Sequence, residues 1–322
     1  MANQTPVLGV EIRGWGSAFP QESLTNDELI ERFGLDSTDE WIKERTGIES
    51  RYISGENENV VSLSVEAGHK ALEMAGVSRP YLVDKLILAT TTSYRKVPGS
   101  HPAIHRELGI AGGASSELNT ACTGFVTALI DGYRHFPVDG VDRMMVIGAD
   151  TLSRITDSSD RGTAILFGDG AGAVVLERGR AESGLLGWAE AVDGEAEELL
   201  YCELGEQEYI RMDGREVFRR AIKVMTDMGE LALDNAGLDV KEIALVVPHQ
   251  ANKRITDYAG KKLGVDEDRI MVSIDKHGNT SSASIPLALV EAINAGRLTH
   301  GDKILLVGFG AGMTAAAAVV RW

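Results

Sequence analysis

The amino-acid sequence predicts an α/β fold built from two similar halves. Short apolar runs rich in β-branched residues alternate with longer amphipathic stretches, a pattern typical of helices that cover largely parallel sheets. A glycine-rich turn that leads into a strand occurs twice, at 167–175 and at 309–320. This repetition suggests a duplicated unit that divides the chain into residues 1–180 and 181–322.

Individual elements follow from hydrophobic periodicity and from helix start signals. Strands are expected at 85–91, 143–149, 164–177, 242–247 and 303–308. Helices are expected at 25–33, 62–75, 122–135, 217–236, 252–263 and 284–295. Thr25 with Glu28, and Ser37 with Glu40, have the spacing of a capping box, in which two side chains satisfy free backbone N–H groups. The acidic stretch 194–208 is expected to be an exposed loop.

Composition argues against several classes of protein. The apolar fraction of 43% and the charged fraction of 25% are those of an ordinary globular protein. No apolar run approaches the ~20 residues that span a bilayer, and the first ten residues lack a signal-peptide layout. Two cysteines are too few for a disulfide framework, so we expect a cytoplasmic protein. A net charge of −16, from 32 basic and 48 acidic side chains, argues against a nucleic-acid partner.

Neither the glycine-rich turns nor the histidine pairs predict a cofactor. Residues 168–172 could form a phosphate-binding loop, but such a fingerprint must open a helix. Here the chain continues into a predicted strand, so a tight turn or a site of close packing is the better interpretation. His101 and His105 have helical spacing without further ligand signals, and we expect no metal site.

Cys122 is the first candidate for chemistry. It lies among small residues at the predicted start of a helix, where the helix dipole lowers a thiol pKa and favours the thiolate. The alternative is a buried, inert cysteine. Cys202 stands in the acidic stretch and has no comparable setting.

His249 and Asn279 are the other two candidates. His249 ends a predicted buried strand, and ligands bind at strand ends in open α/β sheets. Its alternative role is to satisfy a backbone group. Asn279 lies in a turn-like stretch before a helix, where a capping or turn role is the alternative.

Six blocks of sequence extend these observations over nearly the whole chain. They are DEWIKERTGI at 39–48, ACTGF at 121–125, DRGT at 160–163, FGDGAGA at 167–173, VPHQAN at 247–252 and HGNTS at 277–281. In order and spacing the chain resembles the β-ketoacyl-acyl carrier protein synthase III family of the thiolase superfamily. The resemblance implies a thiolase-like fold, in which two βαβαβαββ halves form a five-layered αβαβα core, usually as a homodimer.

The resemblance also implies a reaction. The cysteine of this family takes an acyl group from a coenzyme A thioester, and malonyl-acyl carrier protein then loses carbon dioxide and condenses with it to initiate fatty acid synthesis. Cys122 would carry the acyl group, because a thiolate exchanges readily with a thioester. The backbone N–H groups of Cys122 and Ala311 would form the oxyanion hole. His249 and Asn279 would donate hydrogen bonds to the enolate, and no metal or redox cofactor is implied.

The resemblance also implies which residues bind the substrates. Trp41 and Arg161 would sandwich the adenine of coenzyme A, because a guanidinium plane and an indole face suit a flat ring. Arg45 would contact the phosphate-bearing end, and Asn252 the pantetheine arm. Docking of the acidic carrier protein would use a basic cluster formed by Lys253, Arg254, Lys261 and Lys262.

Departures from the family pattern concern the substrate. Ala311 stands where the family usually has glycine, and Arg215 where asparagine is common. Val97 aligns with a dimer-interface position that often holds a bulky aromatic residue closing the acyl pocket, which suggests a longer or branched primer.

Three alternative functions remain. One is a priming ketosynthase or acyltransferase of a specialised polyketide pathway, although Asn279 favours decarboxylating condensation. A second is a 3-hydroxy-3-methylglutaryl-CoA synthase-like enzyme, for which no matching glutamate block is visible. The third is a non-catalytic partner subunit, against which the intact set of Cys122, His249 and Asn279 weighs.

Overall fold

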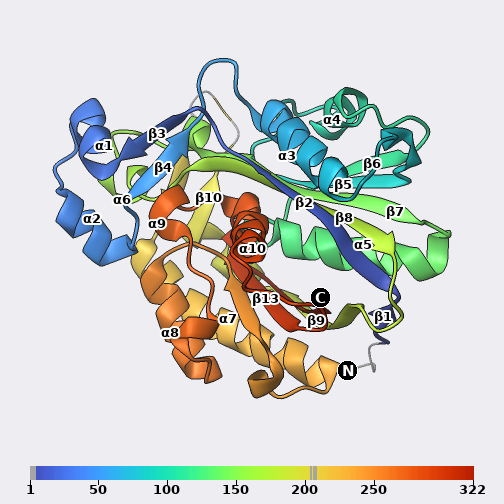
Figure 1. Cartoon of the computed structure of the whole chain (residues 1–322). Helices are drawn as coiled ribbons and strands as arrows, with labels where there is room; N and C mark the ends of the chain where they lie inside the picture. The colour runs from blue at the N-terminus through green and yellow to red at the C-terminus, as the bar shows by residue number, and fades with distance from the viewer. Residues whose placement is uncertain (1–4, 204, 206–208) are drawn as a thin grey trace.

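Two five-stranded sheets form the centre of the molecule (Figure 1). The computed structural model describes residues 5–203, 205 and 209–322. The first sheet has the strand order β2-β8-β7-β5-β6, with strands at Val10–Ala18, Asp169–Arg178, Arg143–Thr151, Lys85–Ala89 and Ala114–Leu118. The second has the order β1-β9-β14-β13-β12, with strands at Val7–Leu8, Gly184–Val192, Thr314–Arg321, Lys303–Gly310 and Leu245–Pro248.

The two sheets repeat one topology. In the first, β5 and β7 are parallel, whereas β8 runs antiparallel to both β7 and β2. In the second, β12 and β13 are parallel, whereas β14 runs antiparallel to both β13 and β9. The second glycine-rich segment runs from the end of β13 into the turn before β14. The first is not a turn, because residues 169–172 already belong to the equivalent strand β8, where Gly172 packs closely against Pro286. We propose that the halves divide near residue 180, between β8 and β9.

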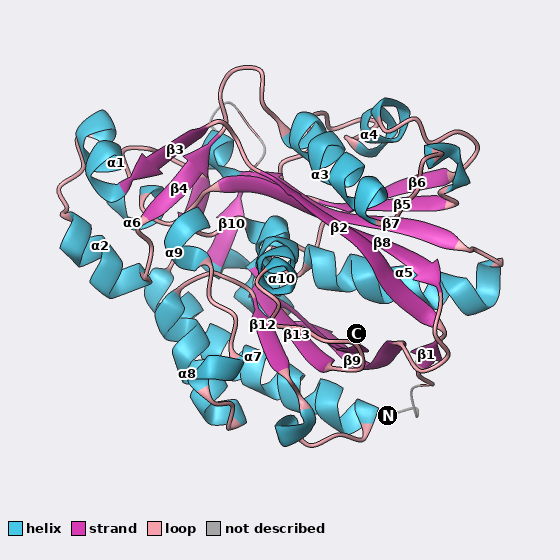
Figure 2. Ribbon diagram, viewed as in Figure 1, coloured by secondary structure: helices cyan, strands magenta, loops and turns pink. Residues whose placement is uncertain are grey.

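Helices occupy three layers around these sheets (Figure 2). α5 (Gly124–Asp139) and α10 (Ser284–Asn294) lie between the sheets, where their apolar side chains share one core cluster with strands of both. α3 (Val60–Met74) and α4 (His101–Glu107) cover the outer face of the first sheet. α7 (Gly214–Ala236) and α8 (Lys253–Leu263) cover that of the second. The predicted five-layered, thiolase-like architecture is confirmed.

Smaller elements gather at one end of the layers (Figure 1). The hairpin of β3 (Glu22–Thr25) and β4 (Ser50–Ile53) carries α1 (Asn26–Phe33) and α2 (Asp39–Thr46). The remaining short elements are α6 (Arg161–Ala164), α9 (Ile274–His277), β10 (Leu200–Cys202) and β11 (Ile210–Met212). No helix formed by the described residues is long and apolar enough to cross a membrane.

Helix starts were predicted with mixed success. The capping box of Thr25 and Glu28 is present. The second box is wrong, because Thr38 rather than Ser37 caps α2 and accepts the backbone N–H of Trp41. The helix expected from residue 122 begins at Gly124, so Cys122 precedes it.

Two longer segments also differ from expectation. The strand expected at 164–177 begins only at Asp169, because Asp160 caps the short helix α6. The acidic stretch 194–208 is not simply an exposed loop. Ala196 is buried, and Leu200–Cys202 form β10, which pairs with β11. Residues 204 and 206–208 lie outside the described residues.

Candidate active site

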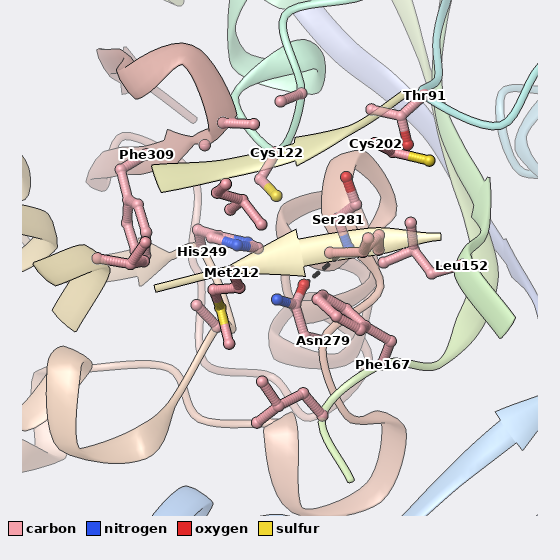
Figure 3. A pocket seen from close by; sticks show the side chains of 18 of the residues that line it. Thr91, Cys122, Leu152, Phe167, Cys202, Met212, His249, Asn279, Ser281 and Phe309 are labelled. Atoms are coloured by element: carbon pink, nitrogen blue, oxygen red, sulfur yellow. Dashed lines mark hydrogen bonds between the residues drawn. The ribbon is translucent and has the colours of Figure 1, made fainter. Parts of the chain in front are cut away.

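The three residues expected to carry chemistry line one cavity of about 480 Å³ (Figure 3). Cys122 precedes α5, His249 follows β12, and Asn279 lies between α9 and α10. The first comes from the first half of the chain and the other two from the second half. Their convergence therefore depends on the way the two halves pack against each other.

Cys122 is held in a sharp turn. Ala121, just before it, has a φ of 50°, a left-handed conformation that non-glycine residues rarely adopt. The thiol is 9% exposed, and burial raises its pKa to about 12, although a hydrogen bond from the Ser281 side chain lowers it in part. The predicted low pKa is therefore wrong for the unliganded protein, because desolvation of the thiolate outweighs the favourable helix start.

His249 is almost completely buried. Its Nδ1 lies 2.5 Å from the Ser284 hydroxyl, which also accepts the backbone N–H of Gln250. The Ser284 hydroxyl can accept that bond and at the same time donate its own proton to Nδ1, an arrangement compatible with a ring proton on Nε2. Burial lowers the pKa of His249 to about 3. The imidazole is therefore neutral at physiological pH.

Asn279 is fixed through both its backbone and its side chain. Its N–H donates to the Leu166 carbonyl at 2.8 Å, and its own carbonyl accepts from Gly168 at 3.0 Å. Its Oδ1 accepts the backbone N–H of Ser281 at 2.9 Å. Figure 3 shows the amide nitrogen on the side away from that bond. The side chain can therefore present N–H donors to the cavity.

The end of β13 borders Cys122 from the other side. Gly310 approaches so closely that an added Cβ would lie 2.6 Å from the Cys122 backbone nitrogen. Ala311 follows and lines the same cavity. The two residues whose N–H groups were expected to form an oxyanion hole are thus brought together.

The residues expected to bind coenzyme A lie close to one another, and one of them, Asn252, lines this cavity. The guanidinium carbon of Arg161 lies 4.9 Å from the centroid of the Trp41 ring, and that of Arg45 lies 5.7 Å from it. Asn252 lines the cavity and donates to the backbone carbonyl of Arg45 at 3.0 Å. Arg161 also donates to the carbonyl of Asp36 at 2.7 Å.

The predicted docking cluster lies along α8 and reaches the cavity at one point. Arg254 covers Phe218 at 5.2 Å, and Phe218 lines the cavity. Lys253 pairs with Asp257 at 2.7 Å. Lys261 and Lys262 are exposed in the last turn, about 10 Å further along the helix axis at 1.5 Å per residue.

Val97 is not brought into the cavity of its own chain. It is 85% exposed on the loop between β5 and α4. Its expected contribution to the acyl pocket of a second subunit stays a prediction.

Several residues of the cavity were missed by sequence reasoning. Ser281 lines the cavity, and Ser284 contacts the ring of His249. They lie within or just beyond the block quoted for the family, yet neither was given a role. Cys202 lines the cavity from β10, where the apolar residues before it could have signalled an inward-facing strand. The other missed lining residues are mostly apolar: Thr91, Leu152, Phe167, Leu200, Ile210, Met212 and Phe309.

Comparisons with known proteins decide the family. A family model described as 3-oxoacyl-[acyl-carrier-protein] synthase III matches residues 116–194, and the model of its C-terminal part matches residues 233–322. A β-ketoacyl-[acyl-carrier-protein] synthase III of Brucella suis is 42% identical over 321 residues, covering 97% of this chain and 98% of its own. The chain belongs to the β-ketoacyl-acyl carrier protein synthase III family.

Solved structures agree with this family assignment. The 3-oxoacyl-[acyl-carrier-protein] synthase III of Aquifex aeolicus is similar with a TM-score of 0.94 and 39% identity, covering 98% of this chain and 100% of that one. A priming β-ketosynthase from a polyketide biosynthetic pathway is similar with a TM-score of 0.92 and 33% identity, covering 100% and 98%. Both synthase III members and a priming enzyme thus share this fold.

Proposed function

We propose that this chain joins an acyl group from coenzyme A to malonyl-acyl carrier protein by decarboxylative condensation, and so forms a 3-oxoacyl-acyl carrier protein. The observation that carries the proposal is the convergence of Cys122, His249 and Asn279 in one cavity. A nucleophilic sulfur and two neutral hydrogen-bond donors are the groups that this two-step reaction needs.

In the first step, the Cys122 sulfur attacks the acyl carbon of the coenzyme A thioester. The carbonyl oxygen becomes an oxyanion, which the backbone N–H groups of Cys122 and Ala311 stabilise. Collapse expels coenzyme A thiolate, which takes up the proton that Cys122 gives up. The products are an acylated Cys122 and free coenzyme A, so the step is balanced without a metal or redox cofactor.

In the second step, the carboxylate of malonyl-acyl carrier protein leaves as carbon dioxide. The electron pair moves into an enolate, whose oxygen accepts hydrogen bonds from His249 Nε2 and the Asn279 amide. The enolate carbon attacks the acyl group, and Cys122 leaves and regains a proton. Both donors are neutral, since the pKa of His249 is about 3 and an amide does not ionise.

Coenzyme A enters between α2 and α8 in this proposal. Asn252 contacts the pantetheine arm, Arg45 the phosphates, and Trp41 with Arg161 the adenine. A ring between Trp41 and Arg161 needs about 7 Å, or two van der Waals contacts of roughly 3.5 Å. Arg161 lies only 4.9 Å from the Trp41 ring, so it must swing away and release the Asp36 carbonyl.

The acidic carrier protein then binds the basic side chains of α8, among which Arg254 is nearest the cavity. We further propose a cytoplasmic homodimer in which Val97 of one subunit faces the acyl pocket of the other. A valine there leaves more room than an aromatic ring, which favours a longer or branched primer. A strict preference for acetyl-CoA over longer acyl-CoA primers would contradict this last point.

A priming ketosynthase of a polyketide pathway is the second candidate. It is favoured by the similarity to the priming β-ketosynthase reported above. The two candidates share their chemistry and differ in primer and carrier protein. Turnover with a panel of acyl-CoA primers and with fatty-acid or polyketide carrier proteins separates them.

Intact-protein mass spectrometry tests the proposed first step. Incubation with acyl-CoA should add the mass of one acyl group, and Cys122→Ala should not gain it. An adduct that persists in Cys122→Ala, or no adduct with any primer, would defeat the proposal and favour a non-catalytic partner subunit. Adding malonyl-acyl carrier protein should then discharge the adduct and release carbon dioxide.

A further inference from the structure

Ser281 has an unusual position that the proposed reaction does not use. It lies just before α10, is 2% exposed and lines the cavity beside Cys122. Its φ of 49° is in the left-handed region that residues with a side chain rarely adopt. Backbone conformations of this kind persist only where the surroundings fix them, and they cluster at functional sites.

Ser281 is next to both sides of the reaction centre, and Figure 3 shows its hydrogen bond to Asn279. Its backbone N–H donates to Asn279 Oδ1 at 2.9 Å, which orients the Asn279 amide. Its side chain lies in the cavity that Cys122 also lines, and it lowers the pKa of the Cys122 thiol. One residue therefore connects the sulfur to the amide, although the two belong to different halves of the chain.

The backbone after Ser281 is held firmly. Ser282 donates to the Asp150 carboxylate through its N–H at 3.0 Å and through its hydroxyl at 2.6 Å. Its hydroxyl also lies 2.9 Å from the Ala89 carbonyl. Because Ser282 is anchored to two strands of the first sheet, the turn at Ser281 cannot relax toward a more common conformation.

We propose that Ser281 is a positioning residue that places the Cys122 sulfur and the Asn279 amide for the same reaction, an inference that rests on the proposed function. The sulfur becomes anionic when Cys122 loses its proton and again when it leaves the condensation product. The Ser281 hydroxyl supplies a donor to that charge inside a buried site, where such a bond is strong.

The pKa of the Cys122 thiol depends on the ionisable and polar groups around it. The ionisable groups near it are Asp150 at the end of β7, whose charge raises the thiol pKa, and His249, which is neutral. Tyr201 and Cys202 line the cavity from β10. Of the two neighbours that act on the thiol pKa, Ser281 lowers it and Asp150 raises it.

The test measures alkylation of Cys122 by iodoacetamide between pH 6 and 10.5, in a Cys202→Ser background so that one cavity thiol reacts. Ser281→Ala should slow alkylation about tenfold at each pH, equivalent to a rise of roughly one unit in the thiol pKa. An unchanged profile would overturn the proposal. The matched control is Thr280→Val, which removes a buried neighbouring hydroxyl that has no hydrogen-bond partner among the described residues. It should leave the profile unchanged.

Ser281→Gly separates the hydroxyl from the backbone. It also removes the donor but accepts a φ of 49° without strain, so it should fold at least as well as Ser281→Ala. The same slowing in both variants is expected. Slowing in Ser281→Ala alone would assign the effect to backbone strain and overturn the role of the hydroxyl.

Acylation by acyl-CoA distinguishes failure of this inference from failure of the proposed function. Wild-type protein that is never acylated on Cys122 would refute the function. Wild-type protein that is acylated, together with a Ser281→Ala variant whose alkylation profile is unchanged, would refute only the role of Ser281. In the condensation assay Ser281→Ala should also lower turnover, because the leaving sulfur loses its hydroxyl donor. The backbone N–H that orients Asn279 is kept in this variant.

Discussion

The starts of the two central helices, α5 and α10, have matching backbones and opposite environments. Ala121 before Cys122 and Ser281 before Ser282 are the two non-glycine residues with positive φ in the described chain, at 50° and 49°. A Cβ added to Gly148 of β7 would meet the Ser282 carbonyl, and one added to Gly308 of β13 would approach the Cys122 carbonyl. Cys122 and Ser282 therefore occupy equivalent positions in the two halves.

The difference arises two residues further along each strand. In β7 that position is Asp150, whose carboxylate accepts the N–H of Ser282. In β13 it is Gly310, which lies against the N–H side of Cys122 without a side chain. At the start of α10 the Asp150 carboxylate thus fills the space beside the Ser282 N–H, and we call this the closed copy. At the start of α5 Gly310 leaves the corresponding space beside the Cys122 N–H free for a substrate oxygen, and we call this the open copy. The candidate site depends as much on the missing side chain at Gly310 as on the thiol.

The largest expected effect is on acyl transfer to Cys122. It comes from giving Gly310, in the open copy, the side chain that Asp150 has in the closed copy. Gly310→Asp places a carboxylate beside the Cys122 N–H, where it would compete with the acyl oxygen. Loss of an oxyanion donor costs roughly 10²–10³ in rate, and the added bulk increases that loss. Acyl transfer to Cys122, followed by mass spectrometry, measures it, with circular dichroism to confirm folding. A folded Gly310→Asp variant that acylates at the wild-type rate would break the comparison.

The next effect distinguishes acylation of Cys122 from the condensation step. His249→Ala and Asn279→Ala should each lower condensation by roughly 10²–10³, because each removes a donor to the enolate. Acylation of Cys122 should change much less, since its oxyanion is bound by backbone groups. Rates of acyl adduct formation and of carbon dioxide release, measured on the same samples, give both numbers. Equal losses in both steps would contradict the assigned roles.

Removing the Asp150 charge from the closed copy should lower the free energy of unfolding more than it changes the catalysed reaction. Asp150 is fully buried and accepts hydrogen bonds from Thr90, Thr91, Thr92 and Ser282. Asp150→Asn should cost roughly 2–3 kcal/mol of unfolding free energy, the usual range for hydrogen bonds to a charged group. Denaturant unfolding measures this cost. Alkylation of Cys122 should become faster, because the Asp150 charge raises the thiol pKa.

The last effect concerns pH. Burial lowers the pKa of His249 to about 3 from its usual 6.5, so between these values the unfolded chain binds a proton that the folded chain does not. Stability from this group is therefore present above pH 6.5 and is lost as the pH falls toward 3. His249→Gln should make acid unfolding less steep. Denaturation midpoints measured from pH 7 to pH 4 that fall in parallel in both proteins would argue against a buried neutral imidazole.

What the sequence predicted correctly had a local signature. Cys122 and His249 each stand between a strand and a helix, whereas Asn279 stands between two helices, α9 and α10. The alternation of elements reveals such positions. The same is true of the capping residue Thr25, whose partner is three residues away. The duplicated topology was visible because a glycine-rich segment at or just before the start of a strand occurs twice.

What the sequence could not predict depends on contacts between distant segments. Asp150 binds Ser282 across 132 residues, and nothing near either residue indicates the pairing. The pKa of Cys122 was misjudged for the same reason, because a helix start is a local feature, whereas burial is created by both halves together. Cys202 is exposed, as its acidic surroundings indicate, but those surroundings did not reveal that it ends β10 and lines the cavity.

The short strand β1 has a consequence for how the protein could be divided. Val7–Leu8 pair with β9 in the second sheet, whereas β2, beginning two residues later, belongs to the first. If the chain were cut near residue 180, the second fragment would lack β1, which borders β9. The first fragment would carry β1 without its partner strand. Coexpressed fragments should reassemble better when residues 5–9 stay on the first fragment, because that strand then links the two pieces across the cut.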